Sequence, residues 1–552
     1  MNFIRFAHWH PTPCKRLTKY VKLTFTKKKH LNLKILIHTV EITLSPKEAA
    51  DENNIALAAA NVEGVNPVDI AHCRVIRRSV DARKKGQIKV NLAVQLFVDE
   101  RPTEEINFDY PDVTNAQPVI IVGAGPAGLF GALELIELGL KPIILERGKN
   151  VSDRKIDIAT LSKNGTINSN SNYAFGEGGA GTYSDGKLYT RSKKRGPNRK
   201  ALEILRFFGA SENIMYDAHP HIGTDKLPRI IQAIRETIIN QGGEVYFNTK
   251  VEDIIVENDV AKGVITTDGT RFEGVAVMLA TGHSARDIYK MMHEKEIELE
   301  TKNFAVGVRV EHPQELIDEI QYKGLKDEYL PAAAYSLVSQ VGGRGVYSFC
   351  MCPGGFIVPA ATQNGQCVVN GMSPSGRNNV YANAGIVTQV TNEDLEDYTK
   401  YYGVLGGMMF QEQLEQMGFA QGGGAQVAPA QRLEDFVSKR SSTSTLRTSY
   451  HPGLVTSDMH HWLPKFMSKA LIGGFKEFDK KMHGFITNQA QVIGIESRTS
   501  APVRIPRSRE TLCHTQVQAL FPVGEGAGYA GGIVSAAIDG MVAANAIKEY
   551  IK

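Results

Sequence analysis

The chain has 552 residues, of which 42% are hydrophobic and 22% charged, ordinary proportions for a globular protein of two or three domains. Its net charge is +4, but residues 1–40 hold nine lysines and arginines and no acid, so the rest of the chain is mildly acidic. This balance argues against nucleic-acid binding by the body of the protein. The lack of any long uncharged apolar run predicts that no helix crosses a membrane.

Residues 1–34 form a basic extension that has no compact apolar segment followed by a cleavage site, which argues against a secretory signal. We expect a disordered or mis-started extension; the alternatives are a targeting peptide and a basic surface contact. The cysteines are sparse and unevenly spaced, which argues against a disulfide framework and favours a reducing, cytoplasmic setting. No cluster of residues has convincing metal-ligand spacing, so we predict no metal site.

A small α/β domain is predicted for residues 35–110. The stretches "ILIHTVEITL" and "IKVNLAVQLFVDE" have strand character. Between them, Ser45 followed by Glu48 is the pattern of a capping box at a helix start, and Gly64 is a suitable helix stop. Residues 110–118, rich in turn-forming residues, are expected to be a linker.

From Pro118 the pattern changes to strand, helix, strand. The apolar run "PVIIV" leads into a GxGxxG loop formed by Gly123, Gly125 and Gly128, and the strand "KPIILERG" carries Glu146 near its end. In this context the glycines predict a dinucleotide-binding loop, with a tight turn at the first, close backbone approach to a pyrophosphate at the second, and close helix–strand packing at the third. Glu146 is expected to accept hydrogen bonds from a ribose diol.

Further along, "GGEVYFNTKVEDIIVENDVAKGVITTDGTRFEGVAVMLATG" predicts a β-meander. Its strands are expected near 251–256, 261–267 and 271–280, separated by Asn-Asp and Asp-Gly turns. The last strand ends on Thr281 and Gly282. Glycine- and proline-punctuated sequence then follows with shorter strand-like runs.

The C-terminal segment again reads as strand, glycine loop and helix, and it decides between NAD and FAD. In flavoproteins of the glutathione-reductase type, a strand followed by Gly-Asp or Gly-Glu near the C-terminus returns to the first domain. There the acid holds the ribityl or pyrophosphate region, and the next helix N-terminus faces the flavin. Gly524 and Glu525 in "GEGAGYAGGIVSAAIDG" resemble that motif. An NAD-only dehydrogenase has no need of such a segment, so the motif favours FAD.

Longer motifs carry a closer resemblance. The stretches "NYAFGEGGAGTYSDGKLYTR", "SFCMCPGGFIVPA", "NGMSPSGRN", "APAQRLEDF" and "GIESRTSAPVRI" resemble the largely uncharacterised family of FAD-dependent dehydrogenases, which is related to the glutathione-reductase-type flavoproteins. The resemblance runs from about residue 35 to the end of the chain. It implies a cofactor and a fold, and it names no substrate.

Together these features predict an α/β protein with a split, Rossmann-like FAD-binding domain that contains the β-meander. Its first segment is predicted at 116–310 and its C-terminal segment at 490–552. An inserted α+β domain at 311–489 is expected to cap the flavin and shape a substrate pocket. The small N-terminal α/β domain at 35–110 completes the organisation.

The residues predicted to contact FAD come from these motifs and from positions beside them. One further source is "FGEGGAGTYSDGKL", a loop so rich in glycine that a flavin contact is favoured over a flexible surface loop. The predicted set is Gly123, Gly125, Pro126, Ala127, Gly128, Glu146, Arg147, Gly179, Gly181, Ser184, Val251, Thr281, Gly282, Gly524, Glu525, Gly532 and Ile533.

The candidates for catalysis are few. Cys350 and Cys352 form a CxC pair that a strand would point to one face, which suggests a disulfide relay with the flavin. However, CxC is not the CxxC of disulfide reductases, a ring that small is strained, and buried inert cysteines are common. Arg498 either clamps an anionic substrate or the polar edge of the flavin, or is a structural arginine.

The function predicted from the sequence is an FAD-dependent oxidoreductase, a dehydrogenase that transfers hydride between flavin and an unidentified small-molecule substrate. No second dinucleotide-binding motif occurs, so either NAD(P)H binds transiently over the flavin, or the electrons come from a substrate or a protein partner. The alternatives are a flavin monooxygenase and, from other classes, a flavin-binding RNA-associated protein or a scaffold.

Overall fold

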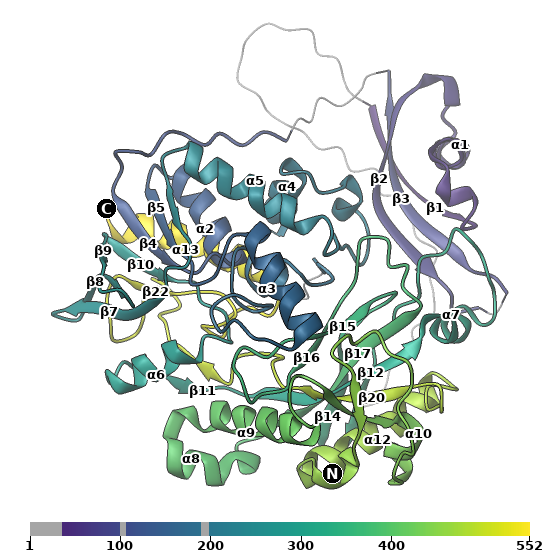
Figure 1. Cartoon of the computed structure of the whole chain (residues 1–552). Coiled ribbons are helices and arrows are strands. Elements are labelled where there is room, and N and C mark those ends of the chain that lie inside the picture. The colour runs from purple at the N-terminus through teal and green to yellow at the C-terminus, as the bar shows by residue number, and fades with distance from the viewer. Residues whose placement is uncertain (1–35, 85, 100–105, 189–197) are drawn as a thin grey trace, which may run out of the picture.

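The computed structural model describes residues 36–84, 86–99, 106–188 and 198–552, and it shows a mixed α/β protein built around three main sheets (Figure 1). The extension predicted for residues 1–34 lies outside the described residues. Among the described helices, none has the length and apolar character needed to cross a membrane.

The N-terminal part is a three-stranded antiparallel sheet with one helix. The strand order is β1-β3-β2, with β1 at Leu36–Leu44, β2 at Ile70–Asp81 and β3 at Lys89–Val98. Helix α1 (Glu52–Glu63) packs on the sheet through Ile55 and Ala59. This sheet stands at one side of the body of the protein (Figure 1).

The helix expected between the first two strands forms, but in two pieces. Ser45 N–H donates to a Glu48 carboxylate oxygen at 2.9 Å and Glu48 N–H donates to Ser45 Oγ at 3.3 Å, which is the predicted capping box. This box closes only a short 3₁₀ turn, and α1 begins after Asp51, whose side chain caps it. Gly64 ends the helix with a φ of +76°, as predicted.

A five-stranded parallel sheet forms the second part, in the order β22-β10-β4-β5-β6. Its strands are β4 (Pro118–Val122), β5 (Lys141–Leu145), β6 (Glu244–Tyr246), β10 (Ala276–Leu279) and β22 (Leu520–Pro522). The apolar runs of the sequence are explained by burial of both faces. The chain enters this sheet at β4, which ends at Val122, and joins it for the last time at β22, which begins at Leu520.

Alternate residues of β4 separate the two faces of this sheet. Val119 and Ile121 lie in one core with helices α2 (Pro126–Glu137) and α13 (Ile533–Tyr550). The next residues along the strand belong to a second core with strands β7 (Val251–Glu257) and β8 (Val260–Thr266). A Cβ on Gly540 would lie 2.0 Å from the carbonyl oxygen of Ala127, so the backbones of α2 and α13 are in contact where they cross.

The predicted meander differs from the structure in its last strand. Residues 271–280 form two strands, with β9 (Arg271–Glu273) pairing with β8, and β10 joining the parallel sheet beside β4. Gly274 lies between them, where a Cβ would be 2.7 Å from the carbonyl oxygen of Pro118. The chain changes sheets at this close approach, and the apolar run that forms β10 begins directly after it.

The third part is a seven-stranded, mostly antiparallel sheet in the order β13-β14-β17-β12-β20-β18-β19. Its strands are β12 (Phe304–Pro313), β13 (Val338–Val341), β14 (Arg344–Cys352), β17 (Tyr381–Val390), β18 (Ala428–Arg432), β19 (Leu454–Thr456) and β20 (Gln491–Glu496). The predicted domain boundaries at 310/311 and 489/490 differ from this sheet, because β12 crosses the first and β20 lies beyond the second. Both strands are almost wholly buried, and sequence alone does not say which sheet a buried strand joins.

The remaining elements cover these sheets or connect them (Figure 1). The helices are α3 (Val151–Asn164), α4 (Asn198–Phe207), α5 (Leu227–Asn240), α6 (Arg286–Glu294), α7 (Gln314–Tyr322), α8 (Glu396–Tyr402), α9 (Gly406–Gln421), α10 (Leu433–Ser438), α11 (Met459–Trp462) and α12 (Lys465–Lys481). The short strands are β11 (Glu300–Thr301), β15 (Phe356–Pro359), β16 (Val369–Met372) and β21 (Val503–Arg504). The expected linker at 110–118 is partly buried, since Tyr110 and Val113 pack into the core beside α2.

Candidate functional site

A cavity of about 360 Å³ opens where the parallel strands β4, β5 and β10 end. Val122, Leu145 and Ala280, at or just after the ends of these strands, all line it. This is the edge at which open parallel sheets bind their ligands. The covering part of the protein also lines the cavity, through Phe349 of β14 in the seven-stranded sheet and Asn370 of the separate short strand β16.

The glycine loop has the geometry expected of a phosphate-binding loop. Gly123 has a φ of +107°, and a Cβ there would lie 2.8 Å from the carbonyl oxygen of Ala280. Gly125 precedes α2, and it lines the cavity together with Pro126 and Ala127. A Cβ on Gly128 would lie 2.0 Å from the carbonyl oxygen of Gly123, so the third glycine permits the helix to pack on its own loop. The free N–H groups of the α2 N-terminus therefore point at the cavity.

Glu146 lines the cavity but also organises the backbone around it. Its carboxylate is 5% exposed and accepts hydrogen bonds from the N–H groups of Ala124 at 2.9 Å, Gly148 at 2.9 Å and Gly176 at 3.0 Å. A carboxylate offers about four lone-pair positions, so this set leaves room for one ribose hydroxyl. Contact with a ribose stays a prediction.

Arg147 is held at the same end of the cavity. Its guanidinium donates to Asp287 at 3.0 Å with both terminal nitrogens and lies 4.2 Å from the centre of the Phe175 ring. Val251, the first residue of β7, also lines the cavity. Its chain neighbour Lys250 forms a second ion pair with Asp287. The guanidinium group of Arg147 is therefore held in one orientation at this end of the cavity.

The glycine-rich loop at 176–186 lies against the phosphate loop. Gly178 N–H donates to the carbonyl of Ala124 at 2.8 Å, and a Cβ on Gly179 would lie 3.2 Å from the Cα of Gly125. Gly179, Gly181 and Ser184 all line the cavity, and their contact with a flavin stays a prediction. The loop is part of the wall and not a detached surface segment.

Arg154 on α3 fixes this loop, and sequence analysis missed it. Its side chain is fully buried and donates to the carbonyl groups of Asn172, Tyr173, Gly176 and Glu177 at 2.7–3.2 Å. Burial lowers the pKa of Arg154 to about 10, so the side chain stays charged at neutral pH. An arginine inside a polar helix carries no sequence signal of such a role.

The C-terminal segment supplies the remaining wall. Gly524 has a φ of +77° and donates its N–H to Asp539 at 2.7 Å, and Asp539 is held in turn by Arg507 at 2.6 Å. Glu525 lines the cavity, as do Gly532 and Ile533 at the N-terminus of α13. A second helix N-terminus therefore faces the same space as that of α2.

The structure brings nearly all of the predicted cofactor residues together. All of them except Gly128 and Gly524, which support the loops from behind, line this one cavity; the others at the β10 end are Thr281 and Gly282. Within the described chain, the buried Oγ1 of Thr281 and Nε of Arg147 have no hydrogen-bond partner. Two helix N-termini, a glycine cradle and polar atoms left for a ligand fit an extended dinucleotide carrying a pyrophosphate.

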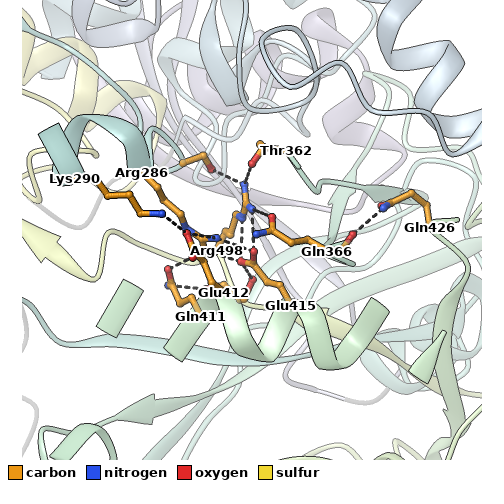
Figure 2. A network of polar contacts seen from close by, with 11 residues as sticks. Arg286, Lys290, Thr362, Gln366, Gln411, Glu412, Glu415, Gln426 and Arg498 are labelled. Atoms are coloured by element: carbon orange, nitrogen blue, oxygen red, sulfur yellow. Dashed lines mark hydrogen bonds and ion pairs between the residues drawn. The ribbon is translucent and has the colours of Figure 1, made fainter. Parts of the chain in front are cut away.

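Arg498 lines the cavity but has no free donor. Its five N–H groups are directed to Glu415, Ser284, Thr362 and Gln366 at 2.8–3.2 Å (Figure 2). An anion could be clamped only by breaking one of these bonds, so the geometry favours a structural arginine, the second of the two alternatives. Cys350 lines the cavity, whereas Cys352 is fully buried behind it.

Comparisons with known proteins agree with this geometry. A family model described as "FAD-dependent protein, C-terminal domain-like" matches residues 303–499, an "FAD binding domain" model matches residues 116–166, and a domain of unknown function (DUF8436) matches residues 36–97. A protein of Clostridium beijerinckii, described only as uncharacterized, is 41% identical over 503 residues, covering 87% of this chain and 93% of the relative.

Solved structures give weaker similarity. A geranylgeranyl bacteriochlorophyll reductase-like protein from Thermoplasma acidophilum is 12% identical over 79% of each chain, with a TM-score of 0.34. The flavin-dependent brominase Bmp2 is 13% identical over 79% of each chain, with a TM-score of 0.35.

The family and its cofactor are identified by the sequence matches alone. The chain belongs to the family of FAD-dependent proteins that includes the Clostridium beijerinckii relative, and FAD is its cofactor.

Proposed function

We propose that the protein is an FAD-dependent oxidoreductase of the dehydrogenase type, related to the glutathione-reductase-type flavoproteins, which transfers hydride between bound flavin and a small-molecule substrate. FAD supplies the hydride chemistry when bound, and the chain supplies orientation and the exclusion of water. The split domain made of β4, β5, β6, β10 and β22 holds the dinucleotide, and the seven-stranded sheet covers it.

The observation that carries the proposal is that one cavity is lined by both parts. The phosphate loop, Glu146 and the two helix N-termini form one wall, while Phe349 and Cys350 of the seven-stranded sheet and Asn370 of strand β16 form another. Such a space between a cofactor domain and a cap is where a flavin would meet a substrate. The wall from the sheet is the part available to a substrate, because the dinucleotide-binding groups occupy the opposite side.

The test is the visible spectrum of the purified protein, recorded before and after anaerobic addition of NADH and then NADPH. Bleaching by one of them supports the proposal and identifies the hydride donor. A flavin spectrum that neither nucleotide bleaches, but that a candidate substrate bleaches, supports the same proposal in the oxidative direction. Rapid reoxidation by oxygen coupled to hydroxylation of a substrate would replace the proposal with a monooxygenase.

A further inference from the structure

Strand β14 is interrupted where it reaches the cavity. Its pairing with β17 shifts register between Phe349 and Cys352, and Cys350 has a φ of +44°. A non-glycine residue in the left-handed region costs free energy, and such bulges and strained residues concentrate at functional sites. This placement calls for an explanation beyond strand packing.

The bulge bears directly on whether the two cysteines can react with each other. In a regular strand, residues two apart are separated by about 6.6 Å, whereas a disulfide needs Cβ atoms about 4 Å apart. The bulge removes the regular spacing, and Cys352 Sγ lies 3.3 Å from the carbonyl oxygen of Cys350, within the same turn. The regular strand spacing that would keep the two side chains of a CxC pair apart is therefore absent at this turn.

The ammonium group of Lys187 lies close to both sulfur atoms. Its Nζ lies 3.9 Å from Cys350 Sγ and 3.6 Å from Cys352 Sγ. The same ammonium lies 3.2 Å from Asp185, a buried carboxylate that Arg377 holds at 2.7 Å. Lys187 thus sits between a fixed carboxylate and the sulfur pair.

The charges around the pair favour one thiolate. A hydrogen bond from Cys352 lowers the pKa of Cys350 well below its usual range; burial opposes this, while Lys187 and Arg309 reinforce it. The hydrogen bond to Cys350 and burial raise the pKa of Cys352, although Lys187 opposes the rise. Both shifts favour a thiolate on Cys350 and a protonated thiol on Cys352, and the thiolate is the nucleophilic form of a cysteine.

The thiolate also lies in the right part of the molecule. Cys350 and Lys187 line the same cavity as Gly181, Gly186 and the N-terminus of α13, the segments expected to contact the flavin ring. The opposite end of the binding site is marked by Glu146 and Arg147.

We propose that Cys350 and Cys352 are a redox-active dithiol that exchanges an electron pair with FAD. In the oxidative direction a sulfur–sulfur bond forms between the two residues, the Cys352 S–H bond breaks, and two electrons and that proton pass to the flavin. The step balances in charge, because the one negative charge of the Cys350 thiolate before it becomes the one negative charge of the reduced flavin after it. The proposal rests on FAD binding and names the thiol–disulfide couple as a second electron carrier of the proposed oxidoreductase.

Electron counting on the FAD-loaded enzyme tests it. The protein is oxidised with excess ferricyanide, desalted, and titrated anaerobically with dithionite. Wild type is expected to take up twice as many electrons per flavin as Cys350→Ser or Cys352→Ser, because a disulfide accepts one more electron pair. Cys73→Ser, in β2 of the N-terminal sheet, is the matched control and should titrate like wild type.

A second readout needs only the wild-type protein. After oxidation, the protein is denatured in iodoacetamide, digested and analysed by mass spectrometry. Cys350 and Cys352 should then be joined by a disulfide and carry no alkyl group. When dithionite is added before denaturation, both cysteines should be alkylated. Equal electron uptake in wild type and the serine variants, or free alkylation of both residues after oxidation, would overturn the proposal. If NADH or NADPH bleaches the flavin of Cys350→Ser as fully as that of wild type while electron uptake is equal, only the dithiol is rejected and the oxidoreductase stands.

Discussion

Arg498 and Glu415 form a buried two-point ion pair, with Nε and a terminal nitrogen of the arginine at 3.1 and 3.0 Å from the carboxylate oxygens. Arg286, at the start of α6, holds the other side of the same carboxylate at 2.7 and 2.9 Å (Figure 2). One carboxylate on α9 therefore joins the dinucleotide-binding part to the part that covers it.

Glu415→Gln is expected to destabilise the protein by about 3–5 kcal/mol, because buried Arg498 loses its carboxylate partner and buried Arg286 keeps only Glu412, at 3.8 Å. Chemical denaturation of the variant and wild type measures the difference. Glu315→Gln, which removes an exposed ion pair with Lys326, is the control and should change the midpoint little. An equal, small effect of both substitutions would show that the buried pair contributes nothing.

The same ion pair predicts a pH dependence. Burial opposes the charged form of Glu415, but Arg286 and Arg498 outweigh it and hold its pKa well below the usual 4.5. A depressed folded pKa contributes stability above the unfolded value and loses it as pH falls toward the folded value. The stability difference between wild type and Glu415→Gln should be constant at neutral pH and shrink below about pH 4.5. Denaturation curves at several pH values test this.

Two glycines of the phosphate loop should separate folding from cofactor binding. A Cβ on Gly125 meets no atom closer than 4.0 Å but lies in the cavity wall, so Gly125→Ala should keep the fold and weaken FAD binding by about tenfold or more, which is ~1.4 kcal/mol. Gly128→Ala should destabilise the FAD-free protein itself by about 1–3 kcal/mol through overpacking.

Flavin fluorescence titration and thermal unfolding of the FAD-free protein measure the two effects. Gly345→Ala, where the nearest atom would be 3.7 Å from the added Cβ, is the matched control and should alter neither. Full FAD affinity in Gly125→Ala would place the pyrophosphate elsewhere in the cavity.

Glu146→Gln should weaken both the loop and the cofactor site. The amide replaces one of the acceptor oxygens by a donor that would face backbone N–H groups, at a cost of about 1–3 kcal/mol. FAD affinity and thermal stability should fall together. Glu252→Gln, on the exposed side of β7, provides the comparison. Unchanged affinity in Glu146→Gln would argue against its contact with the ribose.

Cys350 should react at lower pH than the other half-buried thiol of the described chain. Burial raises the pKa of Cys73 to about 11, whereas the hydrogen bond from Cys352, together with Lys187 and Arg309, lowers that of Cys350. At pH 7 iodoacetamide should therefore label Cys350 faster than Cys73. Peptide mass spectrometry measures the labelling of each cysteine over time. Lys187→Gln should slow the labelling and Lys187→Arg should restore it. Equal rates for the two cysteines would show that Cys350 is an ordinary thiol.

Local patterns determined the ligand-binding loops of this protein. The glycine spacing at Gly123, Gly125 and Gly128, the acid after the next strand, and the C-terminal Gly524–Glu525 segment each depend on residues within about thirty positions of one another. Local chemistry decides which backbone conformations need a glycine and which strand ends need an acid. These features can therefore be recognised from the sequence alone. The family matches then identified FAD as the cofactor.

Only the tertiary structure decided which segments meet. The sheet change at Gly274, the membership of β12 and β20 in the seven-stranded sheet, and the buried roles of Arg154 and Glu415 depend on contacts between distant segments. The same holds for Lys187 and the Cys350–Cys352 pair, which are more than 160 residues apart in the chain and within 4 Å in space. Apolar runs and single charges specify burial or solvation but not the partner, because the partner is chosen by packing of the whole chain.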